Sequence, residues 1–86
     1  MNSEHIEKIK QVLTEWNPLG NLADNYPDLN NYETEVIDIL FFIDKSSSID
    51  RINKVTVTIL TEAFNIDIDL ADSRKYAEEI RSIIKK

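Results

Sequence analysis

The chain has 86 residues, a net charge of −6 and no cysteine. Its length is that of one domain, which we assign to residues 1–86. The excess of sixteen acidic over ten basic residues excludes the basic footprint of a nucleic-acid binder and disfavours anionic membrane surfaces.

A small domain outside the reducing cytoplasm usually needs disulfides, and none can form here. The first five residues lack the basic and apolar regions of a signal peptide. The longest apolar run spans only residues 39–43, too few to cross a bilayer. These features predict a cytoplasmic protein.

The first helix is predicted from about Ser3, its N-cap, to Glu15, because apolar residues recur there every three or four positions. The residues on this face are Ile6, Ile9, Leu13 and Trp16. Asn17-Pro18-Leu19-Gly20 then ends the helix, since proline disfavours helical geometry in the residue before it. Residues 17–31 hold the only glycine, both prolines and seven Asn or Asp residues, which predicts a long loop with one short turn around Leu22–Asp24.

The second helix is predicted to begin at Asn30 or Asn31, with Asn30 and Glu33 as a capping pair, and to run to Ile43. Its apolar residues cover most of the helical wheel, so we expect a central helix packed on several sides. Residues 45–48 end it and supply the next cap.

The third helix is predicted over Ile49–Phe64, with Val57 and Leu60 as exposed apolar positions. The fourth begins after Asp69, its N-cap, and runs to the C-terminus. Residues 55–59 and 66–70 also alternate like strands, but hairpin turn signals are missing. The predicted fold is therefore all-α, a compact four-helix domain with a long loop between helices one and two.

No motif for catalysis or cofactor binding stands out. His5 is the only histidine, a single glycine cannot build a phosphate-binding loop, and the Ser46–Ser48 run has no nucleophile elbow. The acidic stretch Asp67–Asp72 lacks the glycine and the glutamate of a calcium loop. We predict no enzymatic activity, no cofactor and no metal site.

Charge is distributed unevenly. Residues 11–44 contain seven acids and no base, whereas the rest of the chain carries +1. Such a field attracts a basic partner and accelerates its association, although a solvated acidic face that binds nothing is an alternative. Aromatic residues with polar tips lie in the same stretch and are favoured at interfaces. The predicted contact residues are Trp16, Asp24, Tyr26, Asp28, Tyr32, Glu33 and Glu35.

The junction Trp16–Gly20, followed by the pair Tyr32-Glu33, resembles a family of small uncharacterised proteins from Gram-positive bacteria. This resemblance implies a compact helical domain and no activity. A weaker resemblance is to the acidic four-helix immunity proteins of nuclease bacteriocins, but only one tyrosine precedes Pro27, so no residue role carries over.

The sequence thus predicts a small acidic protein-interaction module whose partner is another protein with a basic surface. Self-association is compatible with the pattern. The alternative is an immunity or antitoxin protein that neutralises a basic toxin.

Overall fold

The computed structural model describes residues 3–26 and 32–85. Within these residues the chain forms four α-helices, one 3-10 helix and no strand, which confirms the all-α prediction. The helices are α1 (Ser3–Trp16), α2 (Glu33–Phe42), α3 (Ile49–Phe64) and α4 (Leu70–Ile84), and the 3-10 helix η1 covers Gly20–Asn25.

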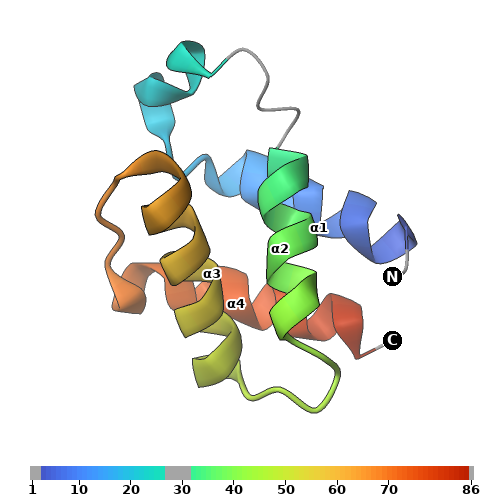
Figure 1. Ribbon diagram of the computed structural model, residues 1–86. Helices are drawn as coiled ribbons and strands as arrows, with labels where there is room; N and C mark the ends of the chain where they lie inside the picture. Colours follow the sequence, from blue (N-terminus) through green and yellow to red (C-terminus); the bar gives the residue numbers. More distant parts are fainter. Residues whose placement is uncertain (1–2, 27–31, 86) are drawn as a thin grey trace.

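The helices form two crossed layers (Figure 1). The antiparallel pair α2 and α3 lies across α1 and α4, and both described ends of the chain lie on the same side of the molecule. α3 packs on α4, α1 packs on both α4 and α2, and α2 packs on α3. One core lies between the layers, built mainly from aliphatic side chains: Ile9, Leu13, Val36, Ile39, Ile52, Leu60, Ala77 and Ile80.

Local signals set most helix ends close to the predicted positions, but Ser3, predicted as the N-cap of α1, is the first residue of that helix. Ser48 accepts a hydrogen bond from the Arg51 backbone N–H at 3.1 Å, and Asp69 accepts one from the Ala71 N–H at 2.7 Å, so both are side-chain N-caps. Asn17 and Asn65 directly follow α1 and α3, and their φ angles are 51° and 53°. Asparagine tolerates this left-handed geometry better than most residues, which fits it to the C-terminal cap.

The start of α2 differs from the prediction. α2 begins at Glu33, and the residue before it, Tyr32, has a left-handed φ of 68° and makes no side-chain cap. The predicted caps Asn30 and Asn31 lie outside the described residues. The short turn predicted around residues 22–24 is confirmed as η1.

Two burial predictions were wrong. Leu60, expected to be exposed, is fully buried, because it continues the four-residue spacing from Ile52 through Thr56 onto the inner face of α3. α2, expected to be packed on several sides, buries only Val36 and Ile39, and it leaves Ile37, Phe41 and Phe42 exposed at 40%, 76% and 55%.

Candidate functional site

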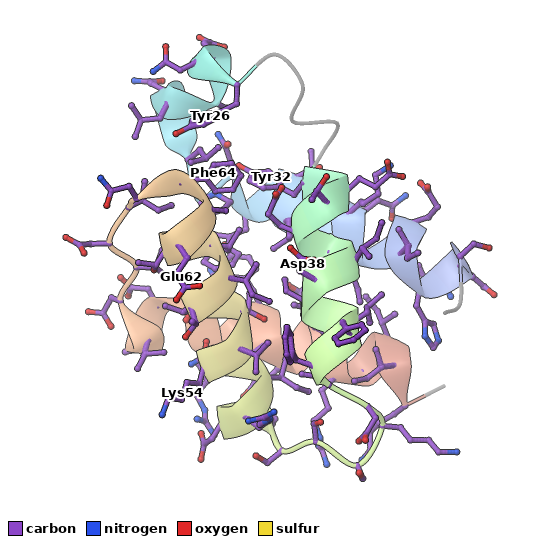
Figure 2. The ribbon with its side chains drawn as sticks, viewed as in Figure 1. Tyr26, Tyr32, Asp38, Lys54, Glu62 and Phe64 are labelled. Atoms are coloured by element: carbon purple, nitrogen blue, oxygen red, sulfur yellow. The ribbon has the colours of Figure 1, made fainter. Side chains whose placement is uncertain are left out.

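Two of the predicted contact residues, Tyr26 and Tyr32, lie at the end of the molecule where η1 approaches the start of α2. Tyr26, Tyr32 and Phe64 gather there in Figure 2. Phe64 makes an edge-to-face contact with each tyrosine ring, with ring centroids 4.9 Å from Tyr26 and 6.0 Å from Tyr32. Edge-to-face pairs of this kind stabilise a fold beyond the area that they bury. These contacts therefore hold Tyr26 and Tyr32 against the C-terminal end of α3.

Tyr32 is a core residue, only 2% exposed. Its hydroxyl accepts a hydrogen bond from the Leu19 N–H and donates one to Asn17 Oδ1, each at 3.4 Å. Burial raises the pKa of this phenol, and the Leu19 N–H offsets part of that shift. Tyr32 thus ties the end of α1 to the start of α2, and its ring is covered.

Trp16 and Tyr26 are half-buried. The Trp16 ring stacks on Tyr76 of α4 with centroids 4.6 Å apart, which closes the core between α1 and α4. Tyr26 packs on Phe64 as described above. Both rings have intramolecular partners, and each keeps one accessible part.

The predicted acids have different surroundings. Asp24 is exposed on η1. Glu33 lies 3.5 Å from the buried Lys10 ammonium, which also lies 3.5 Å from Glu7. Asp28 lies outside the described residues. Glu33 and Glu35 both lie on the first turn of α2, where Glu33 is paired with Lys10, whereas Asp24 lies apart on η1.

Glu35 is half-buried beside Asp38, one turn further along α2. Burial raises the pKa of the Glu35 carboxyl, and the negative charge of Asp38 raises it further, although a backbone hydrogen bond partly compensates. Asp38 is exposed, and α2 carries three acids and no base. This helix therefore presents negative charge along its solvent side.

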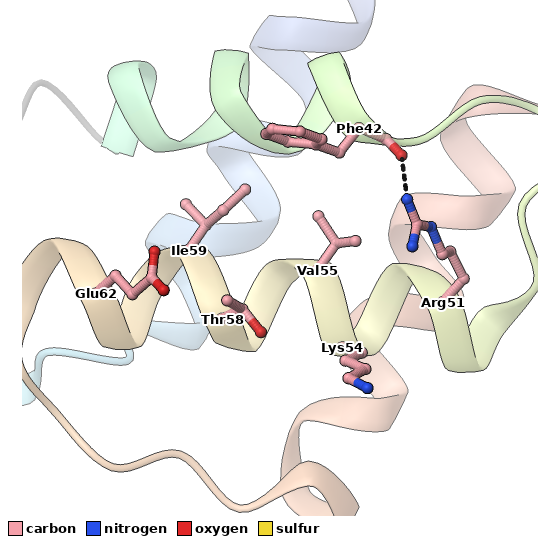
Figure 3. A pocket seen from close by; sticks show the side chains of 7 residues that line it. All are labelled: Phe42, Arg51, Lys54, Val55, Thr58, Ile59 and Glu62. Carbon is pink, nitrogen blue, oxygen red and sulfur yellow. Dashed lines mark hydrogen bonds between the residues drawn. The ribbon is translucent and has the colours of Figure 1, made fainter.

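The largest exposed apolar side chains of α2 lie at its other end. Phe41 and Phe42 contact each other edge to face, with centroids 5.3 Å apart. Beside Phe42, α2 and α3 enclose an open groove of about 310 Å³ (Figure 3). Its lining residues are Phe42, Arg51, Lys54, Val55, Thr58, Ile59 and Glu62.

This apolar face was not among the predicted contact residues. In sequence Phe41 and Phe42 belong to a continuous apolar run and resemble core residues. The signal that identifies them is helical spacing. Positions 36, 39 and 43 recur every three or four residues and form the buried side of α2, so positions 37, 41 and 42 lie on the other side.

Other features of the surface are structural. Asp44 accepts hydrogen bonds from the hydroxyl and backbone N–H of Ser46 at 2.6 and 2.9 Å, which lowers the pKa of its carboxyl and fixes the turn after α2. Asp50 pairs with Arg74 and links α3 to α4. Among the described residues, no group of three carboxylate or histidine side chains lies close enough together to hold a metal ion.

No known family model, curated protein or solved structure matches this chain. The resemblance to a Gram-positive family stays a prediction. Within the described residues, no helix is both long and apolar enough to cross a membrane.

Proposed function

We propose that this protein is a cytoplasmic protein-interaction module whose contact surface is the solvent side of α2. The observation that carries the proposal is the exposure of Phe41, at 76%, in the last turn of a regular helix. Phenylalanine has no polar group to hydrate, and rings are enriched at the centres of protein interfaces. A ring held in this position is suited to enter an apolar pocket of a partner.

The charge of α2 indicates the chemistry of that partner. Asp38 lies four residues before Phe42, and Glu35 lies three residues before Asp38. α2 carries no basic residue. An apolar pocket rimmed by Lys or Arg would complement both features. The proposed partner is thus still a protein with a basic surface, as the sequence predicts. The proposed main contact, however, lies at the C-terminal end of α2 and not at the aromatics of the long loop.

The experiment is affinity capture from cytoplasmic extract with the wild-type chain, followed by binding measurements with the purified partner. Phe41→Ser should weaken binding at least tenfold, because a hot-spot ring contributes about 2 kcal/mol or more. Asp38→Asn should weaken binding less and reduce its salt dependence.

The matched control is Leu70→Ser, which removes another exposed apolar side chain, 51% accessible, from the first residue of α4. It should leave binding unchanged. A partner that binds Phe41→Ser as tightly as it binds the wild type would refute this contact surface.

A second candidate function is that of an immunity or antitoxin protein. It is favoured by the local charge of residues 11–44, which carry seven acids and no base. It predicts that the captured partner is a basic toxin, that its activity is blocked by the wild-type chain, and that Glu35→Gln with Asp38→Asn weakens the inhibition. Full inhibition by that double variant would argue against it.

A further inference from the structure

The groove between α2 and α3 has opposite charges at its two ends (Figure 3). Glu62 lies at one end and Lys54 and Arg51 lie at the other, with Val55, Thr58 and Ile59 between them. Lys54 and Glu62 are both exposed, and their eight-residue separation on α3 corresponds to about 12 Å. The groove is therefore an apolar strip with a basic end and an acidic end.

A strip of this kind is complementary to itself. A two-fold axis perpendicular to α3 near Thr58, midway between Lys54 and Glu62 in sequence, reverses the direction of the groove. It places Lys54 of one copy against Glu62 of the other, twice, and brings the two apolar centres together. A partner that is only basic would match the Glu62 end and be repelled at the Lys54 end.

We propose that this groove binds a second copy of the same chain, with the two α3 helices antiparallel. Phe42, 55% exposed beside the half-buried Val55 and Ile59, supplies the apolar contact of each copy. The inference goes beyond the proposed function, because it uses the groove side of α2 and the outer side of α3, whereas the partner contact uses Phe41, which does not line the groove.

The net charge of −6 does not prevent this pairing. Charges outside the groove are screened over a Debye length of about 8 Å at physiological salt, whereas the Lys54–Glu62 pairs would be in contact. α3 has 16 residues and is about 24 Å long, so the contact is at the small end of specific interfaces. We therefore expect a dimer that forms at roughly micromolar or higher concentrations.

The experiment is sedimentation velocity over a range of concentrations on the wild type, Lys54→Glu, Glu62→Lys, and an equal mixture of the two variants. The wild type should dimerise as its concentration rises. Each variant alone should self-associate at least tenfold more weakly, because like charges then face each other twice. The mixture should form a heterodimer at least as tight as the wild-type dimer, because the two acidic positions of one variant then face the two basic positions of the other.

Lys45→Glu and Asp24→Lys are the matched controls. Both positions are exposed outside the groove, so they change the net charge equally and should leave dimerisation unchanged. A wild-type chain that stays monomeric at several hundred micromolar would overturn the proposal, as would a mixture no tighter than its components. Either result leaves the Phe41 contact untouched, since that contact is measured with a different partner and a different variant.

Discussion

At the N-terminal end of α2 the ring of Tyr32 is 2% exposed, whereas at its C-terminal end the ring of Phe41 is 76% exposed. Tyr32 is hydrogen-bonded to Asn17 and Leu19, which follow α1, and its ring packs on Phe64 of α3. Segments distant in sequence therefore cover it. After Phe42 the chain instead enters the tight Asp44–Ser46 turn and leads directly into α3. Coverage by neighbouring segments, and not hydrophobicity alone, therefore decides which of the two rings is buried.

The two ends of α2 also differ in what their rings contribute, since Tyr32 stabilises the fold and Phe41 is available to a partner. Tyr32, predicted to contact a partner, has a hydroxyl whose hydrogen bonds are made within the fold, with the Leu19 N–H and Asn17 Oδ1. The phenylalanines, which the sequence pattern assigns to the core, are largely exposed and contact each other edge to face. Substitutions at the two ends should therefore affect different measurements.

The largest effect is expected for Tyr32→Ala. Removing a fully buried ring should lower the free energy of unfolding by about 3 kcal/mol or more, because a cavity forms and the loop loses its anchor. Urea denaturation followed by circular dichroism measures this. Phe41→Ala is the control and should change stability by less than about 0.5 kcal/mol. Equal losses for the two variants would break the comparison.

A smaller effect is expected for Tyr26→Ala. This half-buried ring packs edge to face on Phe64, so its loss should lower the free energy of unfolding by about 1–2 kcal/mol. The same denaturation measurement applies. Tyr26→Phe keeps the ring and should restore nearly all of the stability, whereas a deficit as large as that of the alanine variant would mean that the hydroxyl, not the ring, holds the loop.

The smallest effect is expected for Glu35→Gln. The raised pKa of Glu35 means that the folded state disfavours its charged form, so ionisation lowers stability above the folded-state pKa and costs nothing below the unfolded-state value. The variant should therefore be slightly more stable than the wild type near neutral pH, by a few tenths of a kcal/mol. This gain should disappear on acidification.

Thermal unfolding at neutral and acidic pH measures the difference. Asp24→Asn is the control, since Asp24 is exposed on η1. A gain for Glu35→Gln that persists after the carboxyl is protonated would show that the amide packs better, and it would remove charge as the cause.

The sequence alone determined the elements of this protein. The Ser48 and Asp69 caps act within a few residues of themselves, and the third helix, predicted from about Ile49 to Phe64, matches α3. The concentration of turn formers over residues 17–31 likewise predicted the long connection and its short turn. These are local properties, because each depends on backbone groups within one or two helical turns.

Only the tertiary structure decided which faces are covered. The polar Thr56 interrupts the inner stripe of α3, so the sequence pattern does not identify Leu60 as buried. The apolar residues at the C-terminal end of α2 cover several sides of the helix, so the pattern does not show which side has no neighbour. The groove likewise exists only where α2 and α3 lie antiparallel, which places Phe42 beside Val55 and between Glu62 and Lys54. Burial is a relation between segments distant in sequence, and a pattern of single residues does not specify it.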